Sequence, residues 1–249
     1  MSNFLTPDKI RNEYGLEIKE KLIPDGSKLK PNRKLTRGKV EYVTIHNTAD
    51  IEEAEGTNDA EQYARATFNG AMGGVSVHYY IDETDCWQLL RENEMGYHAA
   101  DGKTGPGNGT SLAIEIIMDG KGDKDDKEAE DRGALLAAIL LHRHNLGIDK
   151  LVTHRHWYPA KYCPAYILPH WGKFVERVQA YLNAINKPGD VDGDGKVTTK
   201  DARAALRAAI DLDKLDGPQK VAADVNGNGE IDTGDARDIL RKAIEPEGN

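Results

Sequence analysis

The feature that most constrains this chain is a segment that occurs twice near its C-terminus. Residues 190–210 (DVDGDGKVTTKDARAALRAAI) and 224–244 (DVNGNGEIDTGDARDILRKAI) are identical at twelve of twenty-one positions. Each copy places oxygen-bearing side chains at positions 1, 3, 5, 9 and 12 of a loop, and a glycine at position 6, where the backbone must turn sharply. A Ca²⁺ ion collects its six to eight oxygen ligands with this spacing. A surface turn rich in Asp and Gly would account for one such segment, but not for two with the same pattern.

The duplication predicts one calcium ion in each loop. The expected ligands of the first ion are Asp190, Asp192, Asp194, the backbone carbonyl of Lys196, Thr198 and Asp201, and those of the second are Asp224, Asn226, Asn228, the carbonyl of Glu230, Asp232 and Asp235. Position 12 is aspartate rather than the glutamate of an ordinary EF-hand. Pro188-Gly189 leaves no helix running directly into the first loop. One helix is instead expected after each loop, over 201–210 and 235–244.

This segment resembles the dockerin modules that attach cellulosomal enzymes to cohesins. The resemblance implies a small all-α domain over 188–249 with two EF-hand-type calcium loops. Dockerins select cohesins through residues near loop positions 10 and 11, which here are Thr199-Lys200 and Thr233-Gly234 and differ between the copies. A cohesin partner and self-association of the module therefore both remain open.

The charge and the hydropathy of the chain exclude two other classes of partner, nucleic acid and the membrane interior. The formal net charge is −9, and residues 188–249 contribute −5 of it from nine basic and fourteen acidic side chains. Phosphate binding requires concentrated Lys and Arg, so nucleic acid is not expected as a partner. No stretch approaches the roughly 20 apolar residues that span a bilayer, so membrane insertion is not expected either.

The N-terminus and the cysteines bear on where the chain is made and acts. The first ten residues, MSNFLTPDKI, lack a basic region followed by an apolar run, so no secretory signal is expected. Cys86 and Cys163 are too few for a disulfide framework, although a bond between them stays open. We expect synthesis in a reducing cytoplasm and release through a holin-like pore to act at the cell wall. A secreted chain trimmed of its signal would have the same sequence.

Residues 1–187 have the pattern of an α/β domain. A polar N-terminal arm over 1–38 precedes expected strands over 40–46, 75–81, 86–90, 111–118 and 151–153. Helices are expected over 58–69 with Asn58 as N-cap, over 132–144 and over 171–186, and the charged stretch 119–131 is expected to be a solvated connector. This order predicts a central mixed β-sheet flanked by helices. The domain is expected to end at Lys187-Pro188-Gly189, read as the linker.

Three side chains in this domain have the chemistry of zinc ligands. His46 ends the first expected strand after the arm, His154 follows the strand over 151–153, and Cys163 comes nine residues later. Two imidazoles and one thiolate leave a tetrahedral Zn²⁺ with an open position, as catalytic zinc sites require. Each residue alone has an ordinary structural explanation, such as a buried cysteine. The spacing by itself is therefore weak evidence for a metal.

Four segments in a fixed order resemble a known family. They are residues 42–49 (YVTIHNTA), 96–102 (GYHAADG), 111–116 (SLAIEI) and 153–164 (THRHWYPAKYCP). They resemble the type 2 N-acetylmuramoyl-L-alanine amidases, which include phage and prophage endolysins and peptidoglycan recognition proteins. The resemblance implies one catalytic zinc ion held by His46, His154 and Cys163. It also implies hydrolysis of the amide between N-acetylmuramic acid and the L-alanine of the peptidoglycan stem peptide.

The resemblance extends to residues around the metal. Glu115 matches a glutamate proposed as general base, and a carboxylate in an otherwise apolar strand is costly to bury without a function or a partner. Lys161 matches a lysine thought to stabilise the oxyanion, and His98 matches a histidine that contacts substrate. We assign His98, His78 and Asn108 to substrate binding. A carboxylate satisfied by backbone amides and a surface lysine are the structural alternatives for the two catalytic residues.

Two departures from the family pattern affect these assignments. The interval from His154 to Cys163 is one residue longer than is usual, so His156 is a rival ligand on the same face. Val77 stands where some relatives have a catalytic tyrosine, which places more of the base function on Glu115.

The remaining histidines, His142, His144 and His170, are expected to be structural.

Two other functions remain open besides catalysis by a free amidase. One is a peptidoglycan-recognition module without activity, which is typical of relatives that lack the cysteine ligand, and the other is a cell-wall enzyme docked to a cohesin. The presence of Cys163 favours catalysis.

Overall fold

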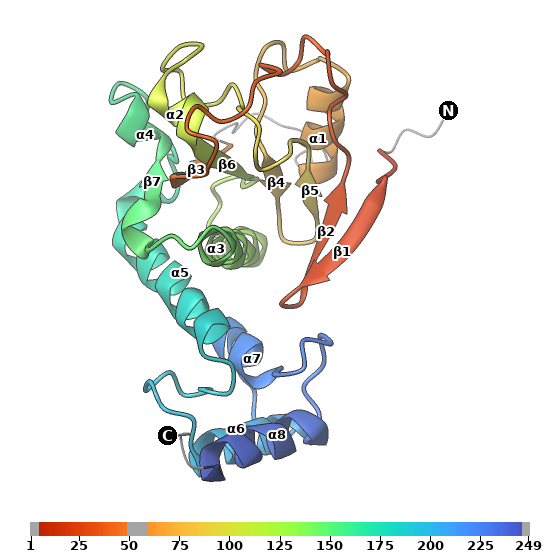
Figure 1. Ribbon diagram of the computed structural model, residues 1–249, viewed down its shortest axis with the longest axis vertical. Helices are drawn as coiled ribbons and strands as arrows, with labels where there is room; N and C mark the ends of the chain where they lie inside the picture. The colour runs from red at the N-terminus through yellow and green to blue at the C-terminus, as the bar shows by residue number, and fades with distance from the viewer. Residues whose placement is uncertain (1–4, 49–58, 246–249) are drawn as a thin grey trace.

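The computed structural model describes residues 5–48 and 59–245, and its N-terminal domain is built on a seven-stranded mixed sheet (Figure 1). The strand order is β1 (Lys9–Glu13), β2 (Leu16–Glu20), β5 (Cys86–Gln88), β4 (Tyr79–Ile81), β6 (Ser111–Ile116), β3 (Tyr42–Asn47) and β7 (Leu151–Thr153). Strands β4, β6, β3 and β7 are parallel neighbours, whereas β1–β2 and β4–β5 are antiparallel pairs. The predicted mixed sheet flanked by helices is confirmed.

Side chains of the central strands alternate between two faces of the sheet. One face packs in the apolar core, and the other, here called the functional face, carries polar residues of β3 and β6. Val43 and Ile45 of β3 join the apolar core under α3 (Lys124–Arg143) and α5 (Trp171–Asn186). Thr44 and His46, each next to one of these residues in β3, project to the opposite face because successive strand side chains alternate. On that opposite face α1 (Ala60–Phe68) packs beside Ala113 of β6. The polar residues of β3 and β6 therefore gather on the face away from α3.

The N-terminal arm contributes two strands that the sequence did not predict. Strands β1 and β2 form a hairpin around Tyr14 and Gly15, whose φ angles are 53° and 81°. Two consecutive positive φ angles are typical of the type I′ turn that joins twisted strands. Leu16 and Ile18 of β2 are buried, while β1 is mostly exposed at the sheet edge. The polar arm predicted over 1–38 therefore includes a β-hairpin at the edge of the sheet.

Two helices begin at places that differ from the prediction. Helix α3 starts at Lys124 inside the expected connector, because the side chain of Asp123 accepts hydrogen bonds from the backbone N–H groups of Asp125 and Asp126 at 3.1 Å each. Helix α1 is capped by Asp59; the predicted cap, Asn58, lies outside the described residues. Short helical turns complete the domain at α2 (Pro106–Thr110), η1 (Ile148–Lys150), α4 (His154–Trp157) and η2 (Leu168–His170).

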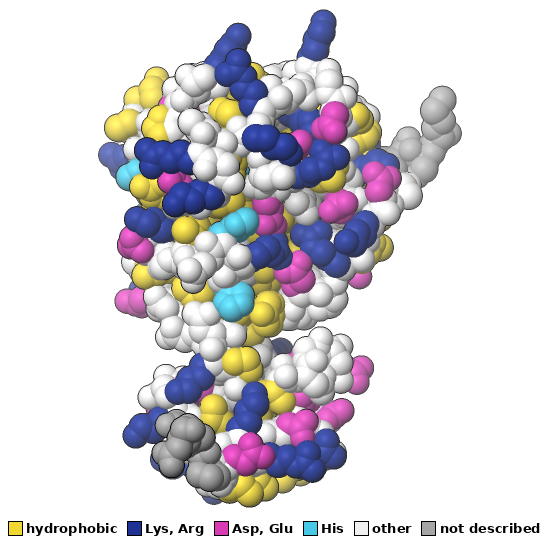
Figure 2. Space-filling model, in the orientation of Figure 1, with side chains coloured by type: hydrophobic (Ala, Val, Ile, Leu, Met, Phe, Trp, Pro, Cys, Tyr) yellow, Lys and Arg dark blue, Asp and Glu magenta, His cyan; other side chains and the backbone are white. Residues whose placement is uncertain are grey.

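Between residues 188 and 245 the C-terminal module has three helices, of which only two were predicted. Helices α6 (Thr199–Ala209) and α8 (Thr233–Ile244) pack against each other, and α7 (Gly217–Ala223) lies beside the end of α5 (Figure 1). Figure 2 shows hydrophobic surface along the lower edge of this module. Leu206, Ile210, Leu240 and Ile244 of α6 and α8 and their flanks are among its exposed apolar side chains.

Helix α7 joins the module to the N-terminal domain by packing. Val221 and Ala222 belong to the same buried core as Val178 of α5. The guanidinium of Arg177 donates to Asp131 of α3 and to Asp216 before α7. The expected linker at 187–189 also contacts α7, because the backbone N–H of Gly189 donates to the carbonyl of Ala222 at 2.8 Å. In the described ranges no helix is long and apolar enough to cross a membrane.

Candidate active site

The structure brings the three predicted zinc ligands together on the functional face of the sheet. His46 lies near the end of β3, His154 begins α4 directly after β7, and Cys163 lies in the loop after α4. Because β7 and β3 are neighbouring parallel strands, His154 enters the site beside His46, and their ring centroids are 4.6 Å apart. The donor atoms of these three buried side chains all lie within 4.8 Å of one another.

The geometry of this cluster fits a tetrahedral zinc ion. Cys163 Sγ lies 3.8 Å from His46 Nδ1. Donor atoms at about 2.0–2.3 Å from a shared Zn²⁺ and at tetrahedral angles are about 3.5 Å apart. The Nε2 atom of His154 is buried without a hydrogen-bond partner, although buried polar atoms are nearly always paired. A metal bond would satisfy it.

The surroundings disfavour charge on the cluster unless a cation is bound. Burial, reinforced by the nearby carboxylate of Glu115, raises the pKa of the Cys163 thiol to about 12. Burial, together with the neighbouring His98 and His154, holds the pKa of His46 well below its ordinary value. A coordinated metal deprotonates a thiol and binds neutral imidazoles, so it suits this environment.

Glu115 and Lys161 both lie near the cluster. Glu115 of β6 is the register partner of His46 in β3, so the two side chains project from the same face. Burial raises the pKa of Glu115 to about 8, and the charge of Lys161 opposes this rise. Lys161 is exposed, and its charge contributes to the lowered pKa values of His46 and His154. The two predicted catalytic side chains are therefore next to the predicted metal ligands.

The loop before α2 adds His98 to the site, and Asn108 holds that loop. His98 Nδ1 is 3.2 Å from His46 Nε2. Asn108 Oδ1 accepts hydrogen bonds from the backbone N–H groups of His98 and Ala99, both at 2.8 Å, and its Nδ2 donates to the carbonyl of Gly102 at 2.9 Å. The side-chain amide of Asn108 thus bonds to the backbone and positions His98, and Asn108 also lines the pocket, so its assignment to substrate binding stays a prediction.

His78 does not reach the pocket, and the prediction that it binds substrate was wrong. Its Nδ1 accepts a hydrogen bond from the backbone N–H of Ala113 at 3.1 Å, and its Nε2 donates to the carbonyl of Glu94 at 2.9 Å. Burial lowers the pKa of His78 to about 4. The neutral ring has one donor and one acceptor, and the backbone uses both. The motif position did not reveal that this ring points inward.

His156 is not part of the metal cluster. It is exposed and stands edge-on to Trp157, with ring centroids 4.6 Å apart. Because α4 is a helical turn and not a strand, residues two apart do not share a face. The rival-ligand alternative therefore fails on secondary structure.

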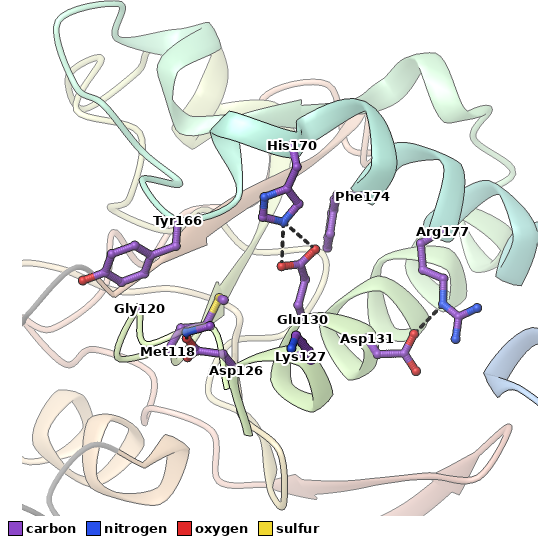
Figure 3. Close-up of a pocket in the computed structure, with 11 residues that line it drawn as sticks. Met118, Gly120, Asp126, Lys127, Glu130, Asp131, Tyr166, His170, Phe174 and Arg177 are labelled. Carbon is purple, nitrogen blue, oxygen red and sulfur yellow. Dashed lines mark hydrogen bonds and ion pairs between the residues drawn. The ribbon is translucent and has the colours of Figure 1, made fainter. Parts of the chain in front are cut away.

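The other histidines pair with partners away from the cluster. His142 Nδ1 is 2.7 Å from Asn186 Oδ1, and His144 Nε2 is 2.6 Å from a carboxylate oxygen of Glu92. Figure 3 shows His170, which pairs with Glu130 at 2.9 Å in a separate hollow of about 360 Å³ between α3 and α5. These pairings agree with the structural roles expected for all three.

The cluster lines a pocket of about 770 Å³, which is within the range of small-molecule sites. One part of its wall is apolar and includes Val75, Tyr97 and Tyr158, whereas Lys103 and Lys161 are cationic. Sequence reasoning missed all three side chains Val75, Lys103 and Tyr158. Val75 was expected in a strand, which in the structure begins only at Tyr79, and Lys103 and Tyr158 lie in segments without a regular pattern.

Comparison with known proteins shows which family the N-terminal domain represents. A sequence model of the N-acetylmuramoyl-L-alanine amidase family matches residues 36–166. The match covers more than half of the chain and includes every residue of the metal cluster. The chain belongs to this family.

Relatives in the amidase family align over the same region. CwlH and XlyA, two N-acetylmuramoyl-L-alanine amidases of Bacillus subtilis (strain 168), are 31% and 35% identical to this chain over 163 and 159 residues. These alignments cover 66% and 64% of this chain, but 61% and 50% of the relatives. The chain thus spans about half to three fifths of their length. The solved catalytic domain of XlyA, at 33% identity, has a TM-score of 0.57 and aligns over 65% of this chain and 98% of that domain.

A second sequence model, the dockerin type I domain, matches residues 188–244. The two loops of this dockerin type I module share one backbone conformation. Gly193 and Gly227 both have a φ of 71°, and Gly195 and Gly229 both have a φ of 89°. Such angles favour glycine, which explains its presence at loop position 6. The loops were predicted as a duplicated pair, and their backbones repeat accordingly.

Three of the predicted calcium ligands lie close together in the first loop. Donor atoms of Asp190, Asp192 and Asp194 lie within 4.8 Å of one another, and Asp190 Oδ1 is buried without a partner. The equivalent Asp224 accepts hydrogen bonds from its own loop at Gly227 and Gly229.

The later loop positions close each loop onto its helix. Thr198 with Asp201 and Asp232 with Asp235 form capping boxes at the starts of α6 and α8. The backbone N–H groups of Lys196 and Glu230 donate to Asp194 and Asn228, each at 2.8 Å, and Asn226 donates to Asp235 at 2.9 Å. Side-chain oxygen atoms thus hold the backbone of each loop in place through hydrogen bonds.

Proposed function

We propose that this protein is a zinc-dependent N-acetylmuramoyl-L-alanine amidase that hydrolyses the bond between N-acetylmuramic acid and the L-alanine of the stem peptide. The observation that carries the proposal is the convergence of His46, His154 and Cys163 in a pocket that also contains Glu115. The names of the family and of its relatives CwlH and XlyA supply the substrate class.

The chemistry follows from what each side chain offers. His46, His154 and Cys163 would hold one zinc ion, which would supply Lewis acidity at this site. Glu115 takes the proton of the attacking water, a role suited to a carboxylate whose pKa of about 8 lies near neutrality. Lys161 places positive charge where the oxyanion develops. The apolar wall of the pocket excludes water from the remainder of the substrate.

We assign two calcium ions to the dockerin type I module, one in each loop. A cohesin is its proposed partner, since the matching family is the dockerin type I domain. Self-association through the same module is the alternative. The proposed site of action is the cell wall, reached either by release from the cell or by secretion.

Digestion of purified peptidoglycan with the zinc-loaded protein tests the proposal by mass spectrometry of the soluble products. Peptides with a free N-terminal alanine, together with glycan that keeps its lactyl group, would support the amidase. New termini inside the stem peptide would instead indicate a peptidase. Sedimentation with the wall and no release would indicate a recognition module, the function that the intact set of three ligands disfavours.

A further inference from the structure

Trp157 lies where the elements of the active site meet. It is the last residue of α4, three residues after His154. Its indole Nε1 donates a hydrogen bond to Thr44 Oγ1 at 2.9 Å, two residues before His46 in β3. The indole also covers Gly107 of α2, where an added Cβ would lie only 2.7 Å from the ring. Trp157 therefore contacts both the strand that carries one metal ligand and the helix that carries Asn108.

The hydrogen bond from Trp157 is the first of a chain of three. Thr44 Oγ1 donates to Ser111 Oγ at 2.8 Å, and Ser111 Oγ donates to the carbonyl of Gly107 at 2.7 Å. Thr44 and Ser111 are both 0% exposed. The chain runs from α4 through β3 and β6 to α2, and it ends at the glycine under the indole. Networks of this kind hold their members in one arrangement because every donor has a single acceptor.

Each element in this network carries a residue of the active site. His154 is on α4, His46 on β3, Glu115 on β6 and Asn108 on α2. Helix α4 is a single turn and has no side-chain hydrogen bond at its N-cap. Its orientation on β3 therefore depends on tertiary contacts such as the one made by Trp157.

We propose that Trp157 is a positioning residue of the zinc site, whose hydrogen bond to Thr44 sets the placement of His154 relative to His46. The inference rests on the zinc binding of the proposed function, but not on the reaction. Groups that hydrogen-bond to metal ligands typically contribute 10–100-fold to metal affinity, and we expect a residue that orients the strand and the helix bearing two ligands to act in the same range. Phenylalanine fills similar space but lacks the indole N–H, so it separates the hydrogen bond from the packing.

The test measures zinc affinity of the full chain by competition with a chromogenic chelator in the wild type, Trp157→Phe, Thr44→Val and the double variant. We expect each single variant to bind zinc about 10–100-fold more weakly. The double variant should lose no more than the larger single loss, because both changes remove the same hydrogen bond. Trp171→Phe is the matched control, since Trp171 stacks on Phe174 of α5 at 5.5 Å and should leave the affinity unchanged.

The absorption spectrum of the Co²⁺-substituted protein reports the geometry of the metal site, which general destabilisation of the fold would not change. Its d–d absorption bands should shift in Trp157→Phe and stay as in the wild type in Trp171→Phe. Wild-type zinc affinity in folded Trp157→Phe, or additive losses in the double variant, would overturn the proposal. Should Trp157→Phe not fold, Thr44→Val is compared with Ser111→Ala, which removes the bond from Thr44 to Ser111 but keeps the one from Trp157 to Thr44. Equal zinc affinities in these two variants would then overturn the proposal. Zinc affinities that follow the expected pattern without release of alanine-terminated peptides would overturn the proposed function alone.

Discussion

His46 and Glu115 sit directly opposite each other on the parallel strands β3 and β6. Because paired residues of neighbouring strands project from the same face, a metal-ligand candidate and a carboxylate are fixed side by side by the sheet itself and not by a loop. This arrangement places the proposed base at a rigid distance from the proposed metal. It also explains why one carboxylate is tolerated in a strand whose other residues are mostly apolar or small.

Replacing Glu115 with glutamine should nearly abolish turnover and leave zinc bound. Glutamine keeps the shape of the side chain but cannot accept the proton, so kcat should fall about 10²–10⁴-fold. Steady-state hydrolysis of a muramoyl peptide, together with metal analysis of the purified variant, measures both effects. Wild-type kcat in Glu115→Gln would remove this residue from the mechanism.

Replacing Cys163 with serine should remove zinc and activity together. A hydroxyl is a poor substitute for a thiolate as a zinc ligand, and the two histidines that remain do not complete a catalytic site. The matched control is His156→Ala, which changes an exposed histidine of the same segment that lies outside the cluster. Metal content and product release should be lost in the first variant and retained in the second. Full activity of metal-free Cys163→Ser would refute the zinc mechanism.

Glu92→Gln should weaken the fold at neutral pH but have little effect in strong acid. Burial alone would raise the pKa of Glu92, but hydrogen bonds from His144 and Tyr79 and the charge of Arg143 outweigh it and lower the pKa to about 2. A depressed carboxyl pKa stabilises the folded state above the unfolded pKa, and this stability is lost as pH falls from about 4.5 toward 2. We expect a loss of at most about 3 kcal/mol at pH 7.

Denaturant unfolding of the wild type and Glu92→Gln across pH 2–7 measures this difference. The two proteins should converge in unfolding free energy near pH 2. A gap that stays constant over the whole range would mean that the ionised carboxylate contributes nothing.

Removing calcium should lower the thermal midpoint of the amidase domain as well as that of the dockerin type I module. Helix α7 ends where the second calcium loop begins at Asp224, and its Val221 is buried in the core of the amidase domain. An ion at 100 times its Kd stabilises its site by about 2.7 kcal/mol, which corresponds to about 5–10 °C for a chain of this size.

Tryptophan fluorescence isolates the response of the amidase domain, because Trp87, Trp157 and Trp171 are the three tryptophans of the chain. EGTA should lower the fluorescence midpoint of the wild type, and Val221→Ala should reduce that shift. Leu240→Ala, which changes an exposed residue of α8, serves as the control. A fluorescence midpoint indifferent to EGTA would show that the two parts unfold independently.

The sequence predicted those features whose geometry is encoded locally. The calcium loops depend on ligands at fixed positions of one short segment, and their glycines mark the required turns. The family resemblance identified His46 and Glu115, but only the register of β3 with β6 showed that both project from one face. The sheet order then brought His154 beside them, which spacing along the chain could not show.

The features that were missed depend on partners distant in sequence. Strand β1 is mostly exposed, so its polar residues carried no strand pattern. Helix α7 is short, and the reason that Val221 is buried lies on α5, some forty residues earlier. His78 shares a segment with pocket residues, but the backbone groups of Ala113 and Glu94 that occupy its ring come from elsewhere.

The packing of α7 on α5 has a consequence for how an anchored molecule would search its substrate. An enzyme joined to its anchor by a flexible linker can turn its active site in every direction around the point of attachment. Val221 and Ala222 of α7 are buried with α5 in the core of the N-terminal domain, while α6 and α8 pack around a smaller core of their own. If a partner bound α6 and α8, this contact through α7 would also restrict the direction in which the pocket faces. Access to bonds in other directions would then require flexibility in the partner that the module binds.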